Sequence, residues 1–279
     1  MPSEKTFDAV AVKLNYLDYG PEEAEPLVML HGGAWRWQEY LSLIPSLGRR
    51  WRVLALDLRG NGRSGWAPGA YRLKDFTGDG VEFVGRLDAP AVLVGHSIGG
   101  VIALMVAARC PDKVKGLVIA DVPLTLETYR QVIESSRAIF AHWLAVKQSA
   151  QSEQDLCLAL AGAYGGLPGV TSGWLLFFAT CLWQLDPTFF DPLLDDFDRF
   201  ADGFDCEAIL KTVASPILFL TGEPRLGAVM TDGEIAWLRG FPHVSCARIG
   251  GVGHLLHLEN AGQAPVLTQM QAFLDRIPA

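Results

Sequence analysis

The sequence lacks the features that mark exported, membrane-spanning and nucleic-acid-binding proteins. Its most apolar window, residues 173–183, is too short to cross a bilayer. The first residues, MPSEKTFDAV, contain no apolar signal region, so we expect a protein that is not exported through a signal peptide. The 23 Lys and Arg residues are scattered and are outnumbered by 31 acidic residues, which gives a net charge of −8. This balance argues against nucleic acid as a partner, because such binding depends on clustered basic side chains.

Cysteine is scarce and irregularly placed. The five cysteines are odd in number, include no C-x-x-C pair and show no zinc-like spacing with the histidines. We therefore interpret them as reduced core residues of a cytoplasmic protein.

Apolar residues, in contrast, make up 50% of the chain. Short apolar segments alternate with helical patterns, which indicates an α/β fold with a mostly parallel sheet and helices on both faces. Segment 8–20 alternates apolar and polar residues and predicts antiparallel edge strands. The other candidate strands are 27–30, 52–58, 91–95, 116–121, 216–222 and 244–250. Candidate helices occupy parts of 37–49, 73–87, 98–110, 231–239 and 261–276.

Residues 124–211 break this alternation, because they contain no convincing strand and are rich in large apolar residues. We interpret them as a helical cap inserted between two parts of the core, residues 1–123 and 212–279. Most of the cap's aromatic residues should pack it onto the sheet, but some should face a cleft, since small-molecule pockets are largely apolar. The candidate residues of a substrate pocket are Trp35, Trp143 and Trp183.

The segment AVLVGHSIGG, residues 91–100, carries the first chemical signal. An apolar strand leads into the motif G-x-S-x-G, and an apolar run of helical length follows. Gly95 and Gly99 allow backbone to approach a turn that is too tight for Cβ atoms. Ser97 would then stand exposed at the end of the strand, as a nucleophile does. A glycine-rich loop with an incidental serine is the alternative interpretation.

A serine hydroxyl needs a base that takes its proton, which points to one of the six histidines. His254 lies in GGVGHLLHLEN, after the last predicted strand, so it should occupy the same edge of the sheet as Ser97. His257 is the less favoured base, because it lies three residues further on. A loop histidine that only bonds backbone is the alternative for His254.

An acyl-transfer site also needs backbone N–H groups directed at the developing oxyanion. One donor should come from Ile98, the residue after the nucleophile. The other should come from Gly33, in the HGGAW loop that follows strand 27–30. His31 in this loop is interpreted as a structural turn residue.

Four motifs, in this order, make the sequence similar to the α/β-hydrolase fold superfamily: HGG (31–33), DLRGNGRS (57–64), GHSIGG (95–100) and GHLLHLEN (253–260). The resemblance runs from about residue 8 to 276 and leaves only the cap unmatched. It implies an eight-stranded, mostly parallel sheet flanked by helices. It also implies Ser97 as nucleophile, His254 as base, and Gly33 and Ile98 as oxyanion-hole donors.

The acid that should orient the histidine is where the sequence departs from this pattern. Most of the superfamily carries it after the strand that follows the cap, in a G-x-x-D pattern, but TGEPR here places Arg225 at that position. Some branches, including haloalkane dehalogenases and certain lactonases, carry it after the preceding strand, where Asp121 lies. We favour Asp121 and keep Glu223 as the alternative acid. A plain loop cap is the other interpretation of Asp121.

A serine nucleophile predicts cleavage of carboxylic esters or lactones through an acyl-enzyme, and the aromatic cap favours small to medium apolar substrates. Ser97 excludes the chemistry of epoxide hydrolases and haloalkane dehalogenases, which use an aspartate nucleophile. No metal or organic cofactor is implied. The alternatives are a C–C bond hydrolase, an amidase, a perhydrolase, a cofactor-independent dioxygenase and a small-molecule receptor. The sequence indicates neither the natural substrate nor an oligomeric state.

Overall fold

The apolar runs form a single eight-stranded sheet in the computed structural model, which describes residues 3–166 and 170–277. Its order is β1-β2-β4-β3-β5-β6-β7-β8. The strands are β1 (Ser3–Asp8), β2 (Lys13–Tyr19), β3 (Pro26–Leu30), β4 (Arg52–Leu56), β5 (Ala91–His96), β6 (Val114–Ala120), β7 (Ile217–Thr221) and β8 (Val244–Arg248). β2 pairs antiparallel with β1 and β4, and the remaining pairs are parallel. The predicted sheet is therefore confirmed.

Helices cover both faces of the sheet, which explains why β3 and β5 are buried along their whole length. One face carries η1 (Trp37–Tyr40), α1 (Ile44–Leu47) and α11 (Asn260–Leu274). The other carries α2 (Leu73–Gly85), α3 (Ile98–Arg109), α9 (Cys206–Thr212) and α10 (Asp232–Leu238). Two short turns of 3-10 helix, η2 (Pro111–Lys113) and η3 (Pro224–Leu226), connect elements.

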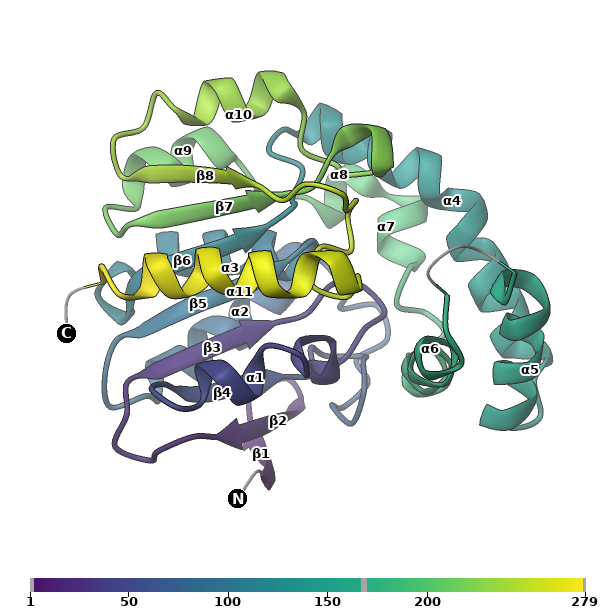
Figure 1. Cartoon of the computed structure of the whole chain (residues 1–279). Helices are drawn as coiled ribbons and strands as arrows, with labels where there is room; N and C mark the ends of the chain where they lie inside the picture. The colour runs from purple at the N-terminus through teal and green to yellow at the C-terminus, as the bar shows by residue number, and fades with distance from the viewer. Residues whose placement is uncertain (1–2, 167–169, 278–279) are drawn as a thin grey trace.

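A helical insertion lies beyond the carboxyl ends of the parallel strands (Figure 1). It consists of α4 (Leu126–Ser149), α5 (Glu153–Tyr164), α6 (Ser172–Gln184), α7 (Asp191–Asp195) and α8 (Phe197–Phe200). The last helix of segment 124–211, α9, packs instead with α3 beside the sheet. The division of the chain into three parts at 123 and 211 stays a prediction.

The first strand begins at Ser3, earlier than the predicted edge region at 8–20. Its six residues are exposed or half-buried, and it is held by pairing with β2 rather than by a buried face. Hydrophobic alternation therefore could not locate it. In the described part of the chain, no helix has both the length and the hydropathy of a membrane span.

Candidate active site

Ser97 lies on a sharp turn between β5 and α3. Its φ of 53° and ψ of −127° place it in a region that residues other than glycine rarely adopt. A Cβ added at Gly95 would lie 2.3 Å from the carbonyl oxygen of Gly99, and one added at Gly99 would lie 2.1 Å from that of Leu30. Close backbone contacts therefore require both glycines of G-x-S-x-G, and the predicted strand-to-helix turn is present.

His254 and Asp121 meet Ser97 at the carboxyl edge of the sheet. His254 lies in the loop between β8 and α11, and Asp121 directly follows β6. The hydroxyl of Ser97 lies 3.1 Å from Nε2 of His254. Nδ1 of the same ring lies 2.7 Å from Oδ2 of Asp121. When the serine donates to Nε2 and Nδ1–H donates to the carboxylate, this is the geometry of a serine–histidine–carboxylate relay.

The carboxylate of Asp121 is fully buried and held from several sides. The hydroxyl of Thr221 donates to it at 2.8 Å, and the N–H groups of Val229 and Met230 donate at 2.8 and 3.3 Å. Burial alone would raise the pKa of this carboxyl. The hydrogen bond and charge of His254, with these donors, outweigh burial and hold the pKa below its usual value. Asp121 is therefore an anion that can fix one tautomer of His254.

Glu223, the alternative acid, has different partners. Its Oε1 accepts from the N–H of Gly251 at 2.6 Å, and its Oε2 accepts from Nε of Arg225 at 2.5 Å. Within residues 3–166 and 170–277, the carboxylate bonded to the His254 ring is that of Asp121. The geometry thus favours the first of the two predicted acids.

Gly33 and Ile98 border the same space as Ser97. A Cβ added at Gly33 would lie 3.9 Å from Cγ2 of Ile98, so the loop after β3 faces the start of α3. Ile98 is the first residue of α3, where an N–H has no carbonyl one turn earlier to bond. Such a group can bind a ligand oxygen, and the predicted oxyanion-hole role stays a prediction.

A cavity of about 790 Å³ opens from Ser97 between the sheet edge and the insertion. Most of the residues that line it have aromatic or aliphatic side chains, among them Trp35, Tyr129, Ile133, Phe140, Trp143, Trp174, Phe189, Phe190 and Leu193. Among the described residues that line it, none is Lys, Arg, Asp or Glu. The cavity therefore suits an uncharged apolar molecule.

Two of the three tryptophans predicted for the pocket, Trp35 and Trp143, line this cavity. Trp183 does not, and that prediction is corrected. Its side chain is 37% exposed, and Nζ of Lys147 lies 5.6 Å from its ring centroid. Trp183 follows Trp174 by nine residues on α6, which is about two and a half turns at about 100° per residue, so the two side chains point to opposite faces of the helix. Composition could not distinguish these two faces of the helix.

A buried cluster of Glu39, His96 and His257, which no sequence motif marks, lies directly behind the relay. Oε1 of Glu39 is 2.5 Å from Nδ1 of His96 and 3.1 Å from Nε2 of His257. Two imidazoles and a carboxylate can bind a metal ion. However, 2.5 Å is a hydrogen-bond distance, too short for two donors that each lie about 2.1 Å from one ion. The signal in the sequence is an acidic residue between two aromatic ones, Trp37 and Tyr40.

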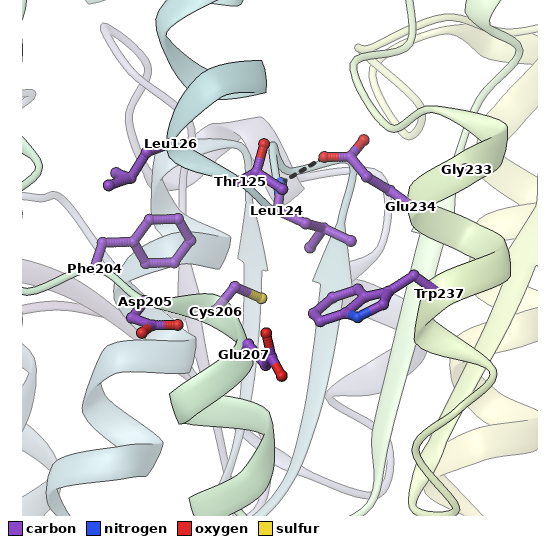
Figure 2. A pocket seen from close by; sticks show the side chains of 10 residues that line it. All are labelled: Leu124, Thr125, Leu126, Phe204, Asp205, Cys206, Glu207, Gly233, Glu234 and Trp237. Carbon is purple, nitrogen blue, oxygen red and sulfur yellow. Dashed lines mark hydrogen bonds between the residues drawn. The ribbon is translucent and has the colours of Figure 1, made fainter.

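A second cavity, of about 470 Å³, lies where the insertion joins the core (Figure 2). Glu234 of α10 accepts there from the N–H of Leu124 at 3.1 Å. The thiol of Cys206 also lines it, but burial raises the pKa of this thiol to about 12, so it stays protonated at neutral pH. Because the relay opens on the first cavity, that cavity is the candidate active site.

Comparison with known proteins agrees with this fold and geometry. A model described as "Alpha/beta hydrolase family" matches residues 27–266. Pimeloyl-[acyl-carrier protein] methyl ester esterase of Neisseria meningitidis serogroup B is 34% identical over 97 residues, which are 35% of this chain and 36% of that protein. Epoxide hydrolase B of Mycobacterium tuberculosis is 40% identical over 114 residues, 38% of this chain and 31% of that protein. The chain thus spans about a third of the length of these curated relatives.

A solved structure extends the comparison to the whole fold. The crystal structure of E-2-(acetamidomethylene)succinate hydrolase matches with a TM-score of 0.75 and 20% identity, covering 99% of this chain and 100% of that one. At this identity the match shows the fold alone. The family model, which spans most of the sequence, establishes that the chain belongs to the alpha/beta hydrolase family.

Proposed function

We propose that the chain is a serine hydrolase that cleaves carboxylic esters or lactones of small to medium, uncharged apolar compounds. One observation carries the proposal: the hydrogen-bonded relay of Ser97, His254 and Asp121 opens on an apolar cavity of about 790 Å³. The relay supplies an activated nucleophile, and the cavity supplies a binding site. The name of the Neisseria relative describes a methyl ester esterase, which supports ester chemistry.

In the proposed reaction, Oγ of Ser97 attacks the ester carbonyl carbon while its proton passes to Nε2 of His254. The negative charge on the carbonyl oxygen meets the N–H groups of Gly33 and Ile98. His254 then gives its proton to the leaving alcohol, and the acyl group stays on Ser97. Water attacks the carbonyl carbon of this acyl group while His254 takes a proton from the water. The bond between the acyl group and Oγ of Ser97 then breaks, and His254 gives its proton to Oγ, which releases the acid and restores the serine. Asp121 stabilises the imidazolium that forms in each step.

The absence of Lys and Arg among the described lining residues narrows the substrate class. A carboxylate that enters an apolar cavity loses its hydration, and without a cationic partner this desolvation costs several kcal/mol. We therefore expect neutral acyl groups to be preferred over acyl groups that end in a free carboxylate.

The test is release of p-nitrophenol from acetyl, butyryl and hexanoyl esters. Ser97→Ala should lower turnover by more than about a thousandfold, because the covalent route is lost. Ser149→Ala, which changes an exposed serine at the end of α4, is the matched control and should keep wild-type turnover. The p-nitrophenyl ester of succinic acid, whose acyl group ends in a free carboxylate, should react far more slowly than the butyryl ester.

Absence of ester turnover in the wild type would contradict the proposal. Cleavage of an anilide or of a C–C bond substrate would then assign the chain to the amidase or C–C hydrolase alternative. Oxygen uptake would indicate the dioxygenase, and tight ligand binding without turnover would indicate the receptor.

A further inference from the structure

A buried carboxylate behind the relay contacts three of the segments that build it. Glu39 belongs to η1, in the loop after β3, and is 1% exposed. Its Oε2 accepts from the N–H of Gly32 at 2.7 Å. Its Oε1 lies 2.5 Å from Nδ1 of His96 and 3.1 Å from Nε2 of His257. A single side chain therefore connects the oxyanion loop, the end of β5 and the segment that precedes α11.

His96 extends this connection to the catalytic histidine. Its Nε2 lies 2.9 Å from the backbone oxygen of His254, and the centroids of the His96 and His254 rings are 4.7 Å apart. A carbonyl oxygen can only accept, so Nε2 of His96 must carry a proton and donate it. The imidazole of His96 thus spans from the carboxylate of Glu39 to the backbone that carries the base.

The charges of the cluster are balanced. Burial alone would raise the pKa of Glu39, but the neighbouring His96 and His257 hold it below its usual value. Burial would lower the pKa of His96, but the carboxylate of Glu39 outweighs burial and raises it. Burial lowers the pKa of His257. The directions of these shifts favour a carboxylate on Glu39, an imidazolium on His96 and a neutral imidazole on His257. In this arrangement the pairing reduces the desolvation penalty of the two ions.

The surroundings hold this cluster in one arrangement. The ring of Tyr40 stacks on His257 with centroids 4.9 Å apart, and its hydroxyl donates to the carbonyl of Leu30 at 2.7 Å. A Cβ added at Gly32 would lie only 3.0 Å from Nδ1 of His96. The cluster is thus close-packed, and its hydrogen bonds have little freedom to rearrange.

We propose that Glu39 and His96 are positioning residues that hold the backbone of His254, so that its Nε2 stays within hydrogen-bond distance of Ser97. The inference rests on the proposed serine-hydrolase function, but neither residue lines the described walls of the substrate cavity. Catalysis is sensitive to such placement, because a shift of about 1 Å caused by a remote mutation can lower the rate about a hundredfold.

The test compares one variant that removes the N–H donor of His96 with a second variant that supplies another donor in its place. His96→Leu removes the N–H that bonds the carbonyl of His254, whereas His96→Gln keeps an amide N–H near the position of Nε2. Functional sites are counted by stoichiometric labelling of Ser97 with a fluorophosphonate, and kcat for p-nitrophenyl butyrate is expressed per labelled site. His96→Leu should lower this kcat about 10- to 100-fold with KM changed less than about twofold. His96→Gln should recover most of it.

A buried ion pair whose two residues are not among those that line the cavity provides the matched control. Nε and Nη2 of Arg59 each donate to Asp79 at 2.6 Å, and both residues are at most 5% exposed. Asp79→Asn should lower the melting temperature but leave kcat per labelled site at the wild-type value. The positioning role is overturned if His96→Leu also lowers only the melting temperature or the number of labelled sites and leaves kcat per labelled site at the wild-type value.

A spectroscopic readout separates this inference from the proposed function. The ¹⁵N chemical shift of Nε2 of His254 reports whether this nitrogen accepts the hydrogen bond of Ser97, whether or not the chain hydrolyses esters. We expect the shift of a hydrogen-bonded Nε2 in the wild type and in His96→Gln, and the shift of an Nε2 without this bond in His96→Leu. A wild type that reacts with neither ester nor fluorophosphonate would reject the proposed function only. An unchanged Nε2 shift in His96→Leu would reject the positioning role.

Discussion

The role of Asp121 as the acid that orients His254 can be tested by replacing its carboxylate with an amide. Asp121→Asn keeps the volume of the side chain, but its amide cannot stabilise the imidazolium of His254 and favours the wrong tautomer. We therefore expect kcat for p-nitrophenyl butyrate to fall by about ten-thousandfold at neutral pH. Steady-state kinetics of the purified variant, with circular dichroism to verify folding, provides the measurement.

Glu223→Gln is the matched control, because it makes the same chemical change in the other predicted acid. Its carboxylate bonds Gly251 and Arg225, so the variant should keep kcat within a few-fold of the wild type. Near-normal kcat in Asp121→Asn, with a large loss in Glu223→Gln, would transfer the role to Glu223.

These two residues also show what sequence can and cannot determine about the site. Ser97 and His254 lie in local motifs, so their identity and their place at the sheet edge were predictable. Asp121 and Glu223 follow β6 and β7, which are hydrogen-bonded neighbours, so strand order brings both acids to the same region. Only the directions of their side chains distinguish them. Asp121 has a φ of 45°, a backbone conformation that the sequence does not reveal.

At the scale of the element, α4 turns one face toward the cavity. Ile133, Ser136, Phe140 and Trp143 line it at the three- and four-residue spacing of a helix face. Ser136 is the smallest of the four. Ser136→Trp should fill part of the cavity and lower kcat/KM for the hexanoyl ester by about tenfold or more, while the acetyl ester loses much less. The profile of kcat/KM against acyl-chain length measures this effect.

Ala138, on the same helix, is exposed and lies outside the set of lining residues. Ala138→Trp adds the same indole to α4 and should leave the acyl-chain profile unchanged. An unchanged profile in Ser136→Trp as well would mean that acyl chains bind elsewhere than along α4.

Elements that bury a face were the ones that the sequence predicted well. β3, β5 and α3 are apolar runs of the expected length, and they form the centre of the fold. β1 was placed too late in the chain because strand pairing, not burial, holds it. The cluster of Glu39, His96 and His257 joins three segments that are far apart in sequence, so no local pattern encodes it.

At the scale of the molecule, the insertion and the core share one continuous apolar cluster. Leu156 of α5 and Phe178 of α6 belong to the same buried cluster as Val101 of α3. A buried polar contact adds to this link, since the hydroxyl of Tyr71 donates to Oδ2 of Asp186 at 2.5 Å. Asp186 also donates its N–H to the carbonyl of Gly60 at 2.8 Å. These contacts predict that the insertion and the core unfold together.

Tyr71→Phe tests this coupling, because it removes one hydroxyl from the link between insertion and core. Asp186 is 1% exposed and keeps its bonds to Thr188, but its Oδ2 loses the hydroxyl of Tyr71. We expect the free energy of unfolding to fall by about 1–3 kcal/mol. Urea unfolding followed by circular dichroism gives this value, and hydrogen–deuterium exchange locates the loss. Peptides from α5 and from β6 should lose protection equally if the molecule unfolds as one unit. A loss confined to α5 would mean that the insertion opens while the sheet stays folded.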